Sequence, residues 1–138
     1  MKNITIVGID NAFVKKFAQK IAREIGYKYI DANEKFDKDL LANINYPMIL
    51  VDELLDEKEN RLIEKLTKND NTVISISDDM FLSNEHYKIL EETTVILILD
   101  ENVGKIKKNI EKMIEKHANF VFNKNEIKTN DIIKIVRG

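Results

Sequence analysis

Short runs of apolar, often β-branched residues alternate along this chain with longer stretches that are apolar on one helical face only. Such alternation is typical of β-α-β units, in which helices connect the strands of a parallel sheet. We therefore predict an α/β fold, a three-layer sandwich built around a five-stranded parallel sheet. The strands are predicted at residues 3 to 7, 27 to 30, 72 to 76, 94 to 99 and 119 to 122.

The clearest helix lies between the first two predicted strands, and Gly26 follows it as a C-terminal stop. Its apolar face carries Val14, Phe17, Ala18, Ile21, Ala22 and Ile25. Further helices are predicted at 34 to 43, 57 to 69, 84 to 92, 102 to 117 and 130 to 136, the last after a Thr129 cap. Residues 47 to 53 fit a buried strand or a helix opened by Pro47, and we expect a helical or irregular segment.

Length and composition narrow the class of protein. A chain of 138 residues forms one hydrophobic core, so we expect a single domain from 1 to 138. The formal net charge is −2, and no segment concentrates positive charge, so nucleic acid is not an expected partner. Cysteine is absent, which excludes disulfides and thiolate metal sites. No apolar run reaches the roughly 20 residues that span a bilayer, so we expect a cytoplasmic protein with no membrane contact.

The segment from Asn3 to Asn33 places a strand, a glycine and a helix in the order in which phosphate-binding loops occur. It reads NITIVGIDNAFVKKFAQKIAREIGYKYIDAN and is similar to the opening of shikimate kinases. The similarity continues through LIEKLTKNDNTVISIS, TTVILILD and HANFVFN, and so covers most of the chain. The resemblance implies a P-loop nucleoside/shikimate kinase-like fold, with ATP and Mg²⁺ as the cofactors of any kinase activity.

The phosphate loop that this resemblance implies, G-x-x-x-x-G-K-[ST], is not kept. Counted from Gly8, the second glycine is replaced by Phe13, the lysine by Val14 and the hydroxyl residue by Lys15. Glycine lets backbone N–H groups close around phosphate, and the lysine neutralises its charge. Neither Phe13 nor Val14 can take those roles.

Gly8, Lys15 and Lys16 remain as candidates for contact with a phosphate. A solvated helix face is the interpretation that we favour for the two lysines. Asp10 or Asn11 is suited to cap the helix, which would occupy the N–H groups that otherwise bind an anion.

The second strand ends in Asp31-Ala32-Asn33, where shikimate kinases have an Asp-x-Asp pair for metal and substrate. Asp31 is therefore a candidate Mg²⁺ ligand, although we favour a helix cap. Asn33, Asp78 and Asp79 are the candidates for a substrate crevice, because strand ends converge there. A divalent cation shared by Asp31, Asp78 and Asp79 is the alternative, and a capping cluster is the favoured interpretation.

Other parts of the family's machinery are also missing. The arginines that clamp shikimate fall near Asp56 and Lys58, and Glu101 to Lys116 reads as one lysine-rich helix in place of an arginine-bearing lid. That helix could also meet a partner or a membrane surface, but a solvated face is favoured. The run from Met48 to Glu53 resembles a Walker B element with no phosphate loop to serve.

His86 and His117 have no neighbours with the spacing of zinc ligands, so we expect them in packing or on the surface.

We expect a non-catalytic domain that needs no cofactor and binds an unidentified protein or small molecule. A divergent ATP-dependent shikimate kinase that uses Lys15 or Lys16 and Asp31 is the alternative. A homo-oligomeric scaffold is a third possibility.

Overall fold

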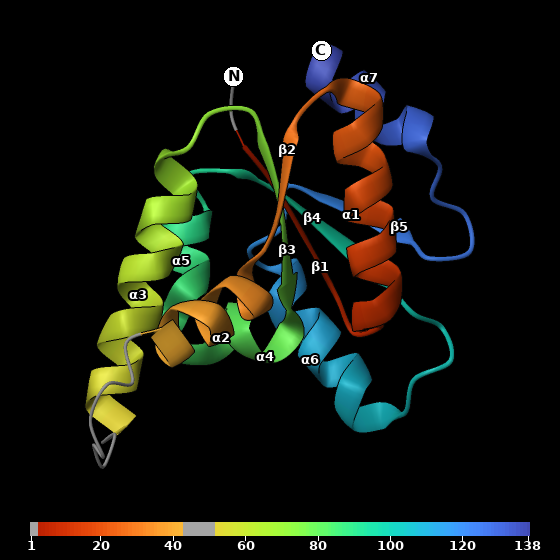
Figure 1. Ribbon diagram of the computed structural model, residues 1–138. Helices are drawn as coiled ribbons and strands as arrows, with labels where there is room; N and C mark the ends of the chain where they lie inside the picture. Colours follow the sequence, from red (N-terminus) through yellow and green to blue (C-terminus); the bar gives the residue numbers. More distant parts are fainter. Residues whose placement is uncertain (1–2, 43–51) are drawn as a thin grey trace.

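The protein's structure, a computed structural model, describes residues 3–42 and 52–138, with side chains at 3–38 and 56–138. Five parallel strands form a sheet in the order β2-β3-β1-β4-β5 (Figure 1). They are β1 (Ile4–Gly8), β2 (Lys28–Asp31), β3 (Thr72–Ser77), β4 (Thr94–Leu99) and β5 (Phe120–Asn123). All five predicted strands are confirmed, each to within one residue at either end.

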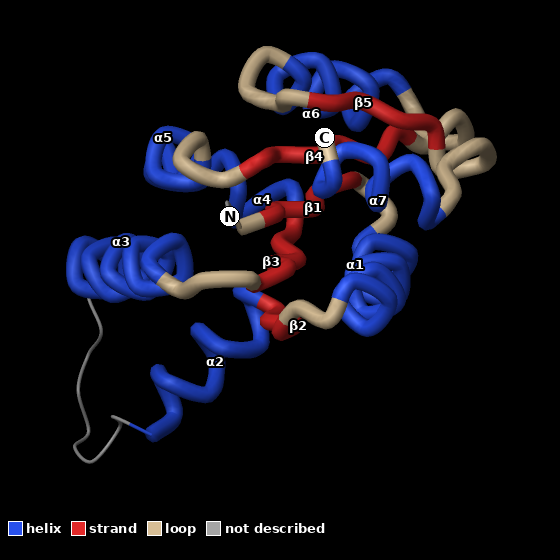
Figure 2. The backbone as a smooth tube through the Cα atoms, turned by 90° about the horizontal axis from the view of Figure 1, so that it is seen from above, coloured by secondary structure: helices blue, strands red, loops and turns tan. Residues whose placement is uncertain are grey.

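Helices cover both faces of this sheet, which confirms the three-layer prediction (Figure 2). The helices are α1 (Asn11–Ile25), α2 (Ala32–Ala42), α3 (Asp52–Lys68), α4 (Asp78–Leu82), α5 (His86–Leu90), α6 (Lys105–Glu115) and α7 (Thr129–Arg137). On one face α1 and α7 pack against side chains that include Ile6 and Ile96. On the other, α3 to α6 pack against the alternate side chains, such as Val7 and Leu97. Successive strand residues point to opposite faces, so each strand contributes to both cores.

The expected ends of α1 are confirmed. Asp10 is the N-cap, and its Oδ1 accepts a hydrogen bond from the Phe13 N–H at 3.1 Å. Gly26 ends the helix in the left-handed conformation, with φ of 76°, and its N–H bonds to the Ala22 carbonyl. Glycine adopts this conformation without a Cβ clash, which explains the stop.

The helix predicted at 84 to 92 is wrong in its start and its length. The chain forms α4, then a short 3₁₀ helix, η1 (Ser83–Glu85), and then α5. Ser77 begins α4 early, because its Oγ accepts the Met80 N–H at 3.2 Å. Asn84 and Glu85 have positive φ angles of 52° and 57°, which break the helical path.

Smaller corrections concern the remaining helix boundaries. The helix predicted at 102 to 117 is shorter, because extended backbone at Gly104 places its start at Lys105. The cap of α7 is Lys128 rather than Thr129, and the Asp131 carboxylate accepts the Lys128 N–H at 2.8 Å. The prediction for 47 to 53 falls mainly on residues 43–51, which lie outside the described ranges.

Among the helices that the structure describes, none combines the length and the apolar character that crossing a bilayer requires.

Candidate functional site

The candidate residues lie at the carboxyl ends of the strands, where α/β proteins of this kind place their ligands. The connection from β1 to α1 is the critical element. β1 ends at Gly8 and α1 begins at Asn11, so only Ile9 and Asp10 lie between them. A phosphate loop keeps residues outside the helix so that its N–H groups can surround an anion. Here the residues from Asn11 onward already belong to α1.

Gly8 is required at this turn by packing. A Cβ atom there would lie 2.7 Å from the Ile98 carbonyl oxygen in β4 and 3.1 Å from Cγ2 of Val14. Because the carbonyl belongs to a neighbouring central strand, it cannot easily move. The glycine is therefore explained without any phosphate contact.

Asp10 and Lys124 together close the start of α1. Lys124 follows β5, and its Nζ lies 2.6 Å from Asp10 Oδ2 and 3.7 Å from Asp100 Oδ2. The hydrogen bond from Lys124, aided by the Phe13 N–H, holds the pKa of Asp10 below its usual range. The same bond raises the pKa of Lys124. A positive charge is thus present at this edge, but a carboxylate of the chain itself neutralises it.

Replacing Asp10 with alanine should lower the free energy of unfolding by about 1 kcal/mol, the usual cost of losing an N-cap. Asp10→Asn keeps the cap and should cost less. Because the pKa of Asp10 is lowered in the folded state, its charge stabilises the fold above the ordinary aspartate pKa, and this contribution disappears as the pH falls through the lowered value.

Urea unfolding of both variants beside the parent chain tests this prediction. The gap between the parent and Asp10→Asn should narrow below pH about 4. A gap that stays constant with pH would contradict a charge-dependent role for Asp10.

Lys15 and Asp31, the two residues that a divergent kinase would need, are in contact with each other. Lys15 Nζ lies 3.2 Å from Asp31 Oδ2. Asp31 Oδ1 also accepts the N–H groups of Asn33 and Glu34, at 3.0 and 3.3 Å. The helix-cap interpretation of Asp31 is thus confirmed, while the ion pair was not predicted. Lys16 is exposed on the surface of α1.

Asn33 and Asp79 line one open pocket of about 290 Å³ between α2, α3 and α4, here called the acidic pocket. Asn33 is held by its amide, which donates to Ser77 Oγ at 2.9 Å and accepts the Ser77 N–H at 3.0 Å. The pocket is lined by Asn33, Phe36, Asp37, Glu59, Ser77, Asp79, Met80 and Ser83. The structure therefore brings together two of the three predicted crevice residues, Asn33 and Asp79.

Asp78, the third predicted crevice residue, does not line this pocket. It is buried at the start of α4, and its Oδ2 lies 3.3 Å from Lys107 Nζ of α6. Within the described residues, no three His, Asp or Glu side chains are placed to hold a metal ion. For the described residues, a cation shared by Asp31, Asp78 and Asp79 is thus not supported.

A second open pocket, of about 390 Å³, lies beside Asp31 and is here called the mixed-charge pocket. Its charges are largely paired: Asp31 with Lys15, and Glu34 with Lys38 at 2.8 Å. The pocket is lined by Gln19, Tyr29, Ile30, Asp31, Glu34, Lys35 and Lys38.

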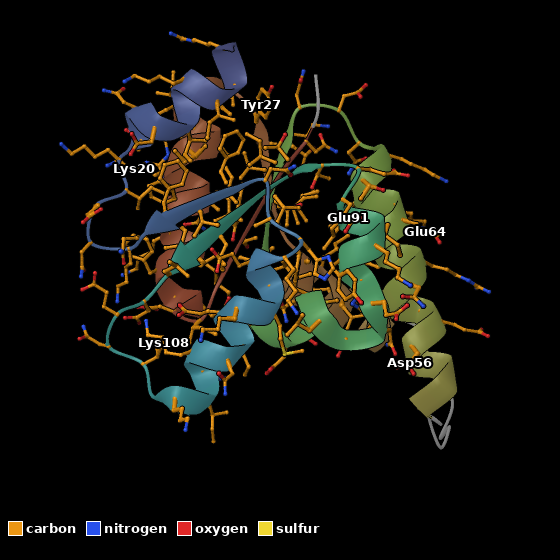
Figure 3. The ribbon with its side chains drawn as sticks, turned by 180° about the vertical axis from the view of Figure 1, so that it is seen from behind. Lys20, Tyr27, Asp56, Glu64, Glu91 and Lys108 are labelled. Atoms are coloured by element: carbon orange, nitrogen blue, oxygen red, sulfur yellow. The ribbon has the colours of Figure 1, made fainter. Side chains whose placement is uncertain are left out.

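The contact between His86 and Glu59 was not predicted from the sequence. His86 is fully buried, and its Nδ1 lies 2.5 Å from the Met80 carbonyl oxygen. Its Nε2 lies 4.0 Å from Glu59 Oε2 on the wall of the acidic pocket. Figure 3 labels Asp56, which precedes Glu59 on α3 and lies toward the carboxyl-end side of the sheet. No local spacing joins α3 to α5, so only a three-dimensional structure reveals this pair.

The strand order, with helices on both faces and candidate residues at the carboxyl edge, is that of α/β proteins with the P-loop kinase fold. The crystal structure of shikimate kinase from Aquifex aeolicus matches with a TM-score of 0.70 at 15% identity, over 98% of this chain and 93% of that one. Shikimate kinase from Acinetobacter baumannii, solved in complex with shikimate, gives a TM-score of 0.68 at 14% identity, over 99% and 91%. These similarities establish the fold.

The family follows from sequence. The family model for shikimate kinase matches residues 15–134, and the chain belongs to the shikimate kinase family. A curated shikimate kinase from Actinobacillus pleuropneumoniae serotype 5b is 26% identical over 105 residues. That match covers 75% of this chain and 61% of the relative, so the chain spans about three fifths of the length of the curated relatives that it matches.

Proposed function

We propose that this chain is a non-catalytic member of the shikimate kinase family that acts by binding a small molecule or a protein. The observation that carries the proposal is the two-residue turn between β1 and α1. Asp10 uses its carboxylate to cap the helix, and Lys124 is paired with that carboxylate. Phosphoryl transfer depends on positioned backbone N–H groups and a free cation at the terminal phosphates, and this turn offers neither.

The alternative is a divergent ATP-dependent shikimate kinase. It is favoured by one observation, the 3.2 Å contact that brings Lys15 and Asp31 to the same place. In that contact, however, Lys15 is already neutralised by a carboxylate, and Asp31 is already occupied by two backbone N–H groups. Both residues would have to leave their partners before they could serve a nucleotide and its metal.

Calorimetric titration of the full chain with ATP and Mg²⁺ separates the two functions. We expect no heat of binding in this titration. In a separate coupled assay we expect no release of ADP that depends on shikimate. The shikimate kinase from Aquifex aeolicus is the positive control for both measurements. Turnover that disappears on replacing Lys15, Lys16 and Asp31 with alanine would overturn the proposal and support the kinase.

A scaffold that acts by self-association predicts a different result. Light scattering would then give a molecular mass that rises with protein concentration, whatever is added to the pockets. A constant monomer mass would leave ligand or partner binding as the mode of action.

A further inference from the structure

The last strand, β5, forms one edge of the sheet, and its outer side is open. In the described sheet it pairs with β4 alone. The Lys124 N–H, directly after β5, donates to the Leu99 carbonyl of β4 at 2.8 Å. Backbone groups of alternate strand residues point the same way, so those of Phe120 and Phe122 also face β4. The N–H and C=O groups of Val121, between them, point outward, where they can pair with another strand.

Exposed apolar side chains accompany this open edge. In the described part of the chain, the large apolar side chains left exposed are Ile106 and Met113 on α6, 77% and 52% exposed, and Phe120 and Val121 on β5, 39% and 36% exposed. The two on α6 are seven residues apart and therefore share one face of the helix. Single exposed apolar residues are common, whereas a group on two successive elements is typical of an interaction surface.

The opposite edge of the sheet, β2, differs from β5. β2 begins at Lys28 and ends at Asp31, which is paired with Lys15. Charges on an edge strand discourage pairing with another chain, and β5, with the sequence FVFN, has neither a charge nor a proline. Figure 3, seen from behind, shows β5 crossing the near side of the molecule between α7 above and α6 below. None of the drawn helices lies in front of it, so a further strand has access to β5.

Positive charge surrounds this edge. Residues 105–138, which contain α6, β5 and α7, have nine Lys and Arg against four Asp and Glu, a net charge of +5, whereas the rest of the chain carries −7. These charges are spread along the sequence, and the fold brings them to the two sides of β5. On α6, Lys105, Lys112 and Lys116 are exposed, and no acid among the described side chains forms an ion pair with them.

These three features together select the occupant of the edge. An extended peptide segment pairs with the open backbone groups, and its apolar and acidic side chains complement the exposed apolar residues and the lysines. A second copy of this chain would set the basic helices α6 and α7 against the same helices, so like charges oppose it. Nucleic acid would not use the open backbone, and Glu115, Glu126 and Asp131 interrupt the positive surface.

We propose that the outer side of β5 binds an extended, acidic segment of a partner protein, which joins the sheet as an additional strand. The segment pairs with the backbone of Val121, its apolar side chains contact Phe120 and Val121, and its carboxylates face the lysines of α6. This inference goes beyond the proposed function, because the β5 edge is separate from both pockets and is present whether or not the chain is a kinase.

NMR titration of the isotope-labelled full chain with the end-capped peptide EVEVEVE tests the inference, and calorimetry gives the affinity. The amide signals of Phe120, Val121 and Phe122 should shift, and higher salt should weaken binding because the lysine contacts are exposed. Two control peptides should not bind. One is KVKVKVK, with the charge reversed. The other is EVEVEVE N-methylated at its central valine and the next glutamate, which keeps every side chain but blocks strand pairing.

Val121→Pro removes the outward N–H without removing a bond to β4, and proline is tolerated on an edge strand in that orientation. We expect it to weaken peptide binding about tenfold, the equivalent of one or two hydrogen bonds. Val121→Thr, which keeps the N–H, the shape and the preference for strands, is the matched control and should bind within about twofold of the parent chain.

The charge contribution is tested by a second pair of variants. Lys112→Glu with Lys116→Glu, at the end of α6, should weaken peptide binding about tenfold. Lys65→Glu with Lys68→Glu makes the same change of charge at the end of α3, which lies away from β5 in Figure 2, and should leave binding unchanged. This comparison stands even if Val121→Pro fails to fold.

Four results would overturn the inference: no shift on β5, equal binding of the N-methylated peptide, an unchanged affinity in the α6 double variant, or tighter binding of single-stranded DNA than of EVEVEVE. A dimer in light scattering that Val121→Pro dissociates would also overturn it, because a second copy would then occupy the edge. The ATP titration is independent of these outcomes. Turnover of ATP would end the non-catalytic proposal whatever the peptide does, and absence of peptide binding would leave that proposal standing.

Discussion

Replacing Phe81 with alanine is expected to lower the free energy of unfolding by about 3 to 5 kcal/mol. Phe81 is on α4, is fully buried and packs near Tyr87, with ring centroids 6.2 Å apart. Truncating it removes apolar surface and leaves a cavity that the rigid sheet beneath cannot fill. Domains of this size are stable by only about 5 to 15 kcal/mol, so the loss would be a large part of the total.

The chain has no tryptophan, so urea unfolding followed by far-ultraviolet circular dichroism is the suitable measurement. Phe81→Leu, which keeps most of the volume, serves as the matched control and should cost less than about 2 kcal/mol. Since α4 also carries Asp79 and Met80, Phe81→Ala should disturb the acidic pocket as well. An alanine variant as stable as the leucine one would show that α4 is not anchored through this ring.

Replacing Gly8 with alanine is expected to lower the free energy of unfolding by about 2 to 3 kcal/mol. The added Cβ would lie 2.7 Å from the Ile98 carbonyl oxygen, well inside normal contact distance. Two central strands would have to separate to accept it. The effect is thus on stability, although Gly8 aligns with the first glycine of a phosphate loop.

Gly104→Ala is the control for Gly8→Ala, because a Cβ there meets nothing within 4 Å and the backbone is extended. As the N-cap of α6 it should cost less than about 1 kcal/mol. Thermal unfolding of the two variants side by side gives the comparison. Equal midpoints would mean that the β1–β4 contact relaxes easily and that Gly8 needs another explanation.

The sheet was predictable because its signal is local. Runs such as Thr94–Leu99 are short, apolar and rich in β-branched residues, as is typical of a parallel strand that is buried on both faces. The break in the helix that we predicted at 84 to 92 was not predictable, because it depends on a contact with a residue that is distant in the sequence. Asn84 takes a positive φ while its side-chain amide donates to Asp56 Oδ1 on α3 at 2.8 Å. Nothing in the neighbouring sequence indicates that bond.

The candidate site was predictable in part for the same reason. The cap at Asp10 follows from its place before an apolar helical face, and the crevice residues Asn33 and Asp79 follow from strand ends. The ion pair between Asp10 and Lys124 could not be predicted in this way, since the two residues are 114 positions apart in the sequence. The contact between His86 and Glu59 likewise depends on how α3 and α5 pack.

The short turn between β1 and α1 also limits how this lineage can evolve. The positions that would form a nucleotide loop, from Asn11 onward, are already inside a capped helix. A substitution at Asp10 would remove both the N-cap of that helix and the partner of Lys124. Any rearrangement of these positions into an open loop would therefore have to unwind the first turn of α1 against the contacts that Asp10 makes with Phe13 and Lys124.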